Sequence, residues 1–242
     1  MRKIRHNQKF MKTSFLFTIL LFLSLIAFLF KEDFAAFLEP TSEPVVSYRL
    51  EEIPKYSGNP YVVIENNKPN FTEEDYAFTG ERYGDLDTLG RCTETFARVG
   101  IDTMPMEKRS SIGMIKPTGW HTVKYDSING KYLYNRCHLI GYQLTGENAN
   151  PNNLITCTRS MNTVGMLEFE NKVAEYVKKT KNHVLYRVKP IFESNHLLAN
   201  GVTIEASSVE DHCKDICFHV FVYNVQDGIE INYENGESYL KK

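Results

Sequence analysis

Short segments rich in β-branched and aromatic residues follow one another through most of the chain after residue 59. Such segments predict strands where turn-forming residues bound them. Asn200-Gly201 adds a hairpin signal between two of them. The predicted strands cover residues 60–66, 131–138, 153–158, 183–192, 196–199, 202–209, 216–225 and 229–233. These segments favour an α+β fold with a mostly antiparallel sheet.

One segment instead repeats apolar residues at three- and four-residue spacing, which predicts a helix that begins at Asn162 and ends near Thr180. Its apolar stripe is Met166, Phe169, Val173, Tyr176 and Val177. Shorter helices are expected at residues 72–76 and 105–109. Around the helix start, the order of elements is strand, loop, strand, helix.

Residues 13–30 are uncharged and strongly apolar, and five basic residues precede them without any acidic residue. A run of about 20 apolar residues spans a bilayer as a helix, and the positive flank places the N-terminus in the cytosol. We therefore expect a transmembrane anchor in the cell membrane, with everything after residue 30 extracellular. A cleaved signal peptide, which would leave a secreted protein, is the alternative.

The predicted organisation has four parts. Residues 1–12 form a basic cytoplasmic N-terminus, residues 13–30 the anchor, and residues 31–58 a stalk that contains three prolines. Residues 59–242 form the extracellular domain, which has the size of a single core.

Charge is segregated along the chain, although its net value is only -2. Residues 131–190 carry nine basic and four acidic side chains, whereas both neighbouring stretches are acidic. This basic island would attract a polyanion. Lysines 172, 178, 179 and 181 are equally well explained as the solvated face of the helix.

The five cysteines, at positions 92, 137, 157, 213 and 217, all lie in the part expected to be exported. Disulfides form in such a space, but an odd count leaves at least one thiol unpaired. No paired C-x2-C pattern supports a zinc site. Cys137 and Cys157 are expected to be small buried fillers, and a redox-sensitive pocket is the alternative.

The candidate chemistry gathers between Tyr134 and Glu170. A neutral His138 can take a proton from water, and Arg136 lies on the same strand face with a guanidinium suited to phosphate. Asn162 offers one oxygen to Mg²⁺, which keeps most of its waters, although it is also a good helix N-cap. Glu170 lies eight residues further, about 80° around an ideal helix, and Asn153 could brace the site.

These residues together predict metal-assisted hydrolysis of phosphodiester bonds. A secreted protease and a non-catalytic adhesin are the alternatives. The protease lacks support because the chain has neither a G-x-S-x-G nor an H-E-x-x-H motif.

The segment NRCHLIGYQLTGENANPNNLIT, followed by MN and LEFE, resembles the DNA/RNA non-specific endonuclease family, in particular its membrane-anchored DNA-entry nucleases. The resemblance extends from about residue 53 to residue 240. It implies a ββα-metal (His-Me finger) fold and sequence-non-specific, Mg²⁺-dependent cleavage of DNA or RNA to 5'-phosphate products, with Mn²⁺ as an alternative ion. A DNA-uptake machinery is the implied partner.

The resemblance also implies roles for individual residues. His138 would be the general base, Asn162 the metal ligand and Asn153 a supporting residue. Glu170 would help to hold the metal's water shell, and Arg136 would hold phosphate.

Two positions depart from the family's tetrapeptide. Asn135 replaces an aspartate and Cys137 replaces a glycine, so a catalytically impaired nucleic-acid-binding surface protein is the alternative function.

Overall fold

The computed structural model describes residues 50–241, and the predicted anchor at residues 13–30 lies outside them. Within the described residues, no helix combines the length and apolarity that a membrane span needs. The 3-10 turn η1 (Leu50–Glu52) precedes Ile53, which is buried against Ile64, Ile191 and Phe221. Residues 50–58, which we assigned to the stalk, therefore pack on the domain at this point.

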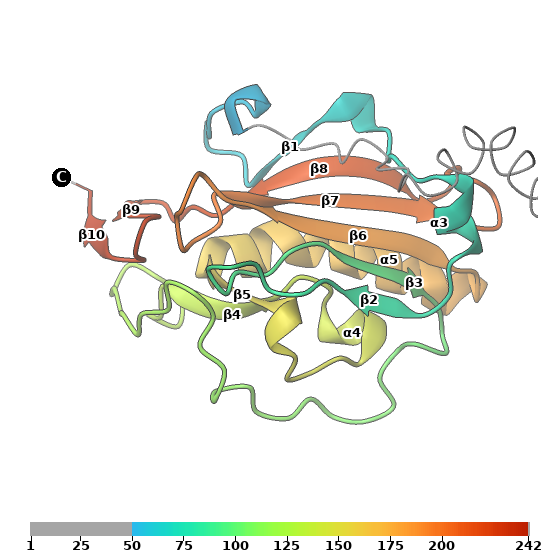
Figure 1. Cartoon of the computed structure of the whole chain (residues 1–242), viewed down its shortest axis with the longest axis horizontal. Helices are drawn as coiled ribbons and strands as arrows, with labels where there is room; N and C mark the ends of the chain where they lie inside the picture. The colour runs from blue at the N-terminus through green and yellow to red at the C-terminus, as the bar shows by residue number, and fades with distance from the viewer. Residues whose placement is uncertain (1–49, 242) are drawn as a thin grey trace, which may run out of the picture. The chain divides into compact units, whose positions relative to one another are not determined.

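A six-stranded antiparallel sheet forms the centre of the domain, with strand order β1-β8-β7-β6-β3-β2 (Figure 1). Its longest strands are consecutive along the chain, and each pairs with the next in full register. The strands are β1 (Tyr61–Val63), β2 (Glu81–Tyr83), β3 (Thr95–Val99), β6 (Val184–Ile191), β7 (Gly201–Ser208) and β8 (Cys217–Tyr223). The predicted antiparallel sheet is confirmed.

The remaining strands form two separate pairs. β4 (Tyr134–His138) pairs with β5 (Leu154–Thr158), and β9 (Ile229–Ile231) pairs with β10 (Ser238–Leu240). The connection from β4 to β5 contains α4 (Tyr142–Thr145) and the 3-10 turn η3 (Pro151–Asn153). After β5, the chain enters helix α5, so the predicted order of strand, loop, strand and helix is confirmed.

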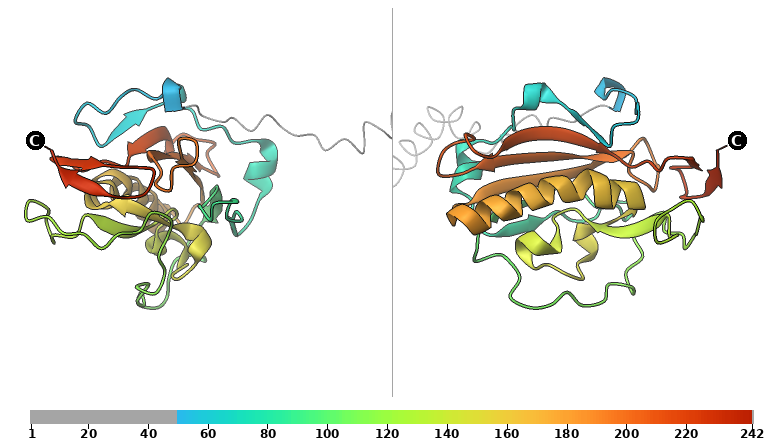
Figure 2. Two further views of the ribbon diagram at one scale, coloured as in Figure 1. Left: turned by 60° about the vertical axis from the view of Figure 1, so that its left-hand side comes forward. Right: turned by 180° about the vertical axis from the view of Figure 1, so that it is seen from behind.

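Helix α5 (Leu167–Thr180) runs across one face of the six-stranded sheet, with the β4–β5 pair beside it (Figure 2). Its predicted apolar stripe is buried in the main core together with the facing side chains of β6, β7 and β8. The helix ends at Thr180, as predicted, and Lys181 caps it in the left-handed conformation.

The start of this helix differs from the prediction. Residues Met161–Met166 form a π-helical turn, named η4, and the α-helix proper begins at Leu167. Asn162 therefore lies inside a helical turn and does not cap the helix. A π turn holds one more residue than an α turn, and such turns are frequent at functional sites.

Of three other local predictions, one is confirmed and two are wrong. A short helix α3 (Glu73–Ala77) forms near the expected place, because Thr72 and Asp75 make a reciprocal capping box. Residues 105–109 are not helical, and residues 196–199 are not a strand. Leu198 instead donates its N–H to Tyr233 O (3.0 Å), which ties this loop to the segment after β9.

One asparagine joins the β4–β5 pair to the large sheet. Asn224, which is fully buried beyond the end of β8, accepts a hydrogen bond from Thr158 N (2.8 Å) and donates to Thr156 O (3.3 Å). Two oppositely directed bonds fix β5 relative to β8. The strand pair that carries the candidate chemistry is thereby fastened to the main sheet.

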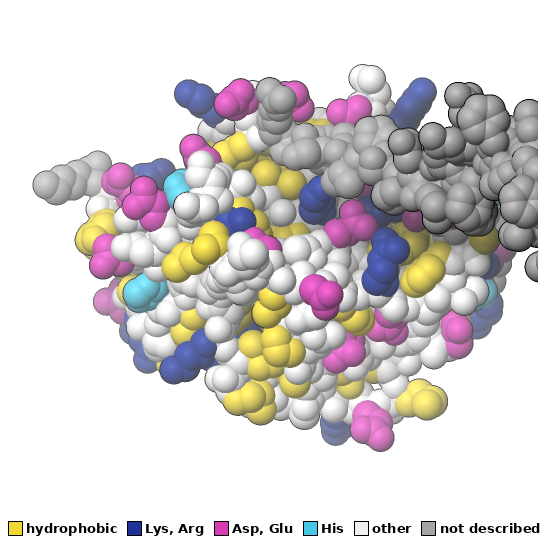
Figure 3. Space-filling model, viewed as in Figure 1, with side chains coloured by type: hydrophobic (Ala, Val, Ile, Leu, Met, Phe, Trp, Pro, Cys, Tyr) yellow, Lys and Arg dark blue, Asp and Glu magenta, His cyan; other side chains and the backbone are white. Residues whose placement is uncertain are grey.

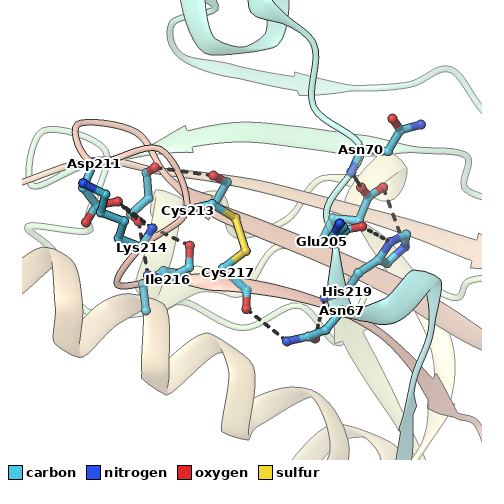
Figure 4. Close-up of a disulfide and its surroundings, with 12 residues drawn as sticks. Asn67, Asn70, Glu205, Asp211, Cys213, Lys214, Ile216, Cys217 and His219 are labelled. Atoms are coloured by element: carbon cyan, nitrogen blue, oxygen red, sulfur yellow. Dashed lines mark hydrogen bonds and ion pairs between the residues drawn. A yellow bond between two sulfur atoms is a disulfide. The ribbon is translucent and has the colours of Figure 1, made fainter.

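The cysteines form two disulfides. Cys137 and Cys157 join β4 to β5 beneath the candidate site, with Cα atoms 5.8 Å apart and both side chains fully buried. Cys213 and Cys217 close the connection between β7 and β8 (Figure 4), and Asp211 accepts a hydrogen bond from Lys214 N inside this loop. Cys92 is a buried free thiol. The predicted burial of Cys137 and Cys157 and the predicted leftover thiol are confirmed.

Candidate active site

A pocket of about 730 Å³ opens between the β4–β5 pair, α4, the start of α5 and the long connection between β3 and β4. His138, Arg136, Asn135, Asn162 and Glu170 all line it. Five of the residues that we selected from the sequence therefore meet in one place, although they come from three different elements.

His138 has a defined orientation at the end of β4. Its side chain is only 6% exposed, and Nε2 lies 2.7 Å from the backbone oxygen of Asn148. A carbonyl oxygen only accepts hydrogen bonds, so Nε2 carries the proton and Nδ1 carries the lone pair. Nδ1 faces Arg109, whose Nη2 lies 3.4 Å away.

The pKa of His138 is lowered to about 4, chiefly by burial, and the positive charge of Arg109 acts in the same direction. The hydrogen bond to Asn148 acts in the opposite sense. The imidazole is therefore neutral at physiological pH, which is the form that can accept a proton.

Asn153 is fully buried and does not line the pocket. Its Oδ1 accepts the N–H of Ile140 (2.9 Å), and its Nδ2 donates to the oxygen of the same residue (3.0 Å). Its own backbone oxygen accepts the N–H of Leu139. Asn153 thus fixes the two residues that follow His138, in keeping with the bracing role that we considered for it.

Glu170 lies on the face of α5 that turns toward α4 and the sheet. Its carboxylate occupies the space that a Cβ on Gly141 would need, so the two elements touch only because residue 141 has no side chain. Withdrawal from bulk water raises the pKa of Glu170 to about 7, whereas a hydrogen bond from Gln143 and the charge of Arg109 lower it. Glu168, on the opposite face, is exposed.

Asn162 faces the same pocket from the π-helical turn, near the base of the β4–β5 pair. Within residues 50–241, histidine, cysteine and acidic side chains do not gather in groups of three or more that could enclose a metal ion. A metal bound here would depend on Asn162, Glu170 and water. Mg²⁺ suits such a set of few oxygen ligands, because it keeps several of its waters.

Arg136 is less free than its sequence position suggested. Its guanidinium donates to the backbone oxygens of Gly113 (2.9 Å) and Ile115, and it stacks on the ring of Trp120 at 3.9 Å. These contacts hold the β3–β4 connection against the mouth of the pocket. The side chain anchors this loop, and only its remaining N–H groups can reach a phosphate.

Two arginines at the pocket were not selected from the sequence. Arg109 comes from the β3–β4 connection, which has no regular secondary structure near that residue, and Arg159 follows β5 directly. Arg159 adjoins the predicted second strand and belongs to the basic island. These two features could have identified it as a candidate site residue from the sequence. Arg109 had no such signal, because its place depends on how the loop folds back onto α4 through Tyr142 Oη and Glu107 O (2.9 Å).

Asn135 also lines the pocket, and its Nδ2 is buried without a hydrogen-bond partner among residues 50–241. Buried amide donors are normally paired. An unpaired amide donor at a pocket is suited to donate a hydrogen bond to an oxygen atom of a ligand.

On the face shown in Figure 3, acidic and basic side chains are interspersed. Helix α5, which carries Lys172, Lys178 and Lys179, lies on the side seen in the rear view of Figure 2. Positive charge near the pocket comes instead from Arg109, Arg136 and Arg159.

Comparison with known proteins gives consistent results. A family model described as DNA/RNA non-specific endonuclease matches residues 71–210. A curated deoxyribonuclease from Streptococcus dysgalactiae subsp. equisimilis is 32% identical over 118 residues, which are 47% of this chain and 34% of that protein. The chain therefore spans about a third of the length of this relative.

Solved structures share the fold. The magnesium-bound structure of NucA from Streptococcus agalactiae superposes with a TM-score of 0.69 at 22% identity and covers 79% of this chain and 93% of its own. The Sda1 nuclease with a bound zinc ion gives a TM-score of 0.58 at 27% identity over 76% of this chain and 97% of its own. Both are metal-bound nucleases, and the ion differs between them.

Proposed function

The chain belongs to the DNA/RNA non-specific endonuclease family and is therefore a hydrolase of the nuclease class, and we propose that it is a Mg²⁺-dependent, sequence-non-specific endonuclease that cleaves DNA, with RNA as a second substrate, to 5'-phosphate products. The observation that carries this proposal is the orientation of His138. Its protonated Nε2 is committed to Asn148 O, and its unprotonated Nδ1 is directed toward the residues of the pocket.

In the proposed reaction, His138 Nδ1 takes a proton from a water molecule, which attacks the phosphorus atom. The neutral imidazole is available for this because its pKa lies well below neutral pH. Asn153 keeps the base in place by fixing the backbone just beyond it. Arg109 and Arg159 would bind the phosphate oxygens as charged donors.

Asn162 and Glu170 would hold the metal ion, Asn162 directly and Glu170 through the water shell. When bound, the ion would stabilise the charge that develops on the phosphate and on the leaving 3' oxygen. The neutral amide of Asn162 and the single carboxylate of Glu170 favour an ion that retains water, and this supports Mg²⁺ over zinc, with Mn²⁺ as a substitute.

We propose further that the nuclease domain acts outside the cell, held at the membrane by residues 13–30, where a DNA-uptake machinery is its candidate partner. The basic flank of that apolar run supports this orientation. The two disulfides of the domain support an oxidising compartment. Release after signal cleavage remains the alternative, and it predicts a mature N-terminus after residue 30.

The test is cleavage of plasmid DNA by the full-length protein, purified in detergent, with Mg²⁺ and with EDTA. His138→Ala should abolish cleavage without unfolding the domain. His121→Ala is the matched control, because His121 also bonds a backbone oxygen, that of Asn235 (2.9 Å), but lies outside the pocket. A folded wild-type protein that binds DNA but does not cut it would instead support the impaired, binding-only alternative.

A further inference from the structure

A tyrosine beneath the pocket has a hydroxyl without an evident partner. Tyr186 lies at the middle of β6 and is 0% exposed. Its Oη is buried and has no hydrogen-bond partner among residues 50–241. Buried tyrosine hydroxyls usually find a partner, because leaving one unpaired costs free energy.

The fold places the ring of Tyr186 on the face of the sheet that α5 covers. Tyr186 alternates with Leu185 along β6, and its ring packs in the core that α5 covers, whereas Leu185 packs on the other face of the sheet. Glu170 precedes Val173 and Val177 by three and seven residues, so it shares their face of α5. Tyr186 and Glu170 therefore approach from the two sides of one interface.

The electrostatics agree with this placement. After burial itself, the carboxylate of Glu170 is the group that raises the pKa of Tyr186. Tyr186 therefore stays uncharged, and its hydroxyl can donate a hydrogen bond to the carboxylate.

We propose that Tyr186 is a positioning residue for Glu170: its hydroxyl donates a hydrogen bond to the Glu170 carboxylate through one water molecule. Gln143 of α4 favours the charged form of this carboxylate, and Gly141 leaves room for it. A donor from the sheet would hold the carboxylate from its inner side and leave its remaining lone pairs for the pocket. The inference deepens the proposed function, on which its catalytic part rests.

The first measurement does not depend on activity. Unfolding of the full-length protein is compared for Tyr186→Phe in the wild-type and Glu170→Ala backgrounds, at mildly alkaline pH where the carboxylate is charged. We expect Tyr186→Phe to lower stability in the wild type and to be neutral or stabilising with Glu170→Ala. An equal effect in both backgrounds would show that the two side chains do not interact and would overturn the proposal.

The second measurement is catalytic. Tyr186→Phe should lower kcat about tenfold, as loss of a hydrogen bond to a charged group would, with little change in KM for DNA. Tyr76→Phe is the matched control, because Tyr76 Oη bonds Ser207 Oγ (2.6 Å) away from the pocket, so it should cost stability and leave kcat unchanged. An unchanged kcat for Tyr186→Phe would refute the positioning role. A wild-type protein without cleavage would refute the proposed function, while the unfolding comparison would still test the contact.

Discussion

One amide side chain, that of Asn153, holds both backbone polar groups of Ile140, accepting its N–H and donating to its oxygen. The two residues lie at the ends of the connection between β4 and β5, so this pair of bonds closes the loop behind His138. The arrangement gives Asn153 a structural role, and His138, the proposed base, depends on it indirectly.

Replacing Asn153 by alanine should therefore destabilise the domain. Two buried backbone groups would lose their partner, which costs roughly 2–5 kcal/mol in unfolding free energy. Urea unfolding measures the loss. Asn152→Ala, at the partly exposed neighbour, should cost much less; similar losses at both positions would contradict the assigned role.

His138 and Glu170 should oppose one another in the pH dependence of stability, measured without metal. The folded-state pKa of His138 is lowered from 6.5 to about 4, so the unfolded chain binds more protons between these values and stability rises with pH. The pKa of Glu170 is raised from 4.5 to about 7, so the folded state binds more protons and stability falls as pH rises.

Each contribution can reach about 1.4 kcal/mol per pH unit. In the wild type they offset each other between pH 4.5 and 6.5. Glu170→Gln should steepen the rise of stability with pH in this range, and His138→Gln should reverse it. Chemical unfolding at a series of pH values decides the matter, and parallel curves for both variants would rule out these shifts.

Arg109 should control the protonation of His138. Its charge lowers the pKa of the imidazole, so Arg109→Gln should raise that pKa, as followed by NMR titration of the His138 ring. Lys108→Gln, at the exposed adjacent position, serves as the control for loss of one charge. No difference between the two variants would show that the 3.4 Å approach to Nδ1 is unimportant.

Gly141→Ala should impair activity more than stability. The added Cβ would overlap the Glu170 carboxylate and displace it, and displacement of a catalytic group by about 1 Å costs on the order of 100-fold in rate. Gly113→Ala is a suitable control, because its Cβ would meet nothing closer than 3.6 Å. Kinetics that are equally normal for both variants would mean that Glu170 can relax without loss.

Peptide mapping without reduction should find Cys137 joined to Cys157 and Cys213 joined to Cys217, with Cys92 free. Burial raises the pKa of the Cys92 thiol to about 12, so iodoacetamide should not label it until the protein unfolds. Serine at both positions 137 and 157 should cost about 3 kcal/mol of stability. Rapid labelling of the native protein would contradict the buried position of Cys92.

The sequence predicted the features that depend on local pattern. The stripe of α5 follows from helical periodicity, and the long strands follow from their β-branched and aromatic residues, because each of these elements buries one face against the same core. His138, Asn162 and Glu170 were selected because they match a family motif, and the structure places all three at one pocket.

The remaining features depend on contacts between distant segments. Arg109 reaches His138 only because the β3–β4 connection is held by Arg136 and Tyr142, and no local pattern records such a path. The role proposed for Tyr186 also has no local sequence signal, because its place in a strand predicts only a buried core residue. Residues 105–109 and 196–199 do not form the regular structure predicted for them, because such short segments are ambiguous without their tertiary partners.

The π-helical turn at Met161–Met166 brings Asn162 and Glu170 to one side of the helix. It takes up one residue more than an α turn, so the eight residues between the two positions turn about as far as seven would in an α-helix, which leaves them about 20° apart around the axis instead of about 80°. Adding one further residue within this turn should rotate Asn162 away from Glu170 by about 100° and be far more damaging than most substitutions in it. Along this stretch, the number of residues is itself a functional property.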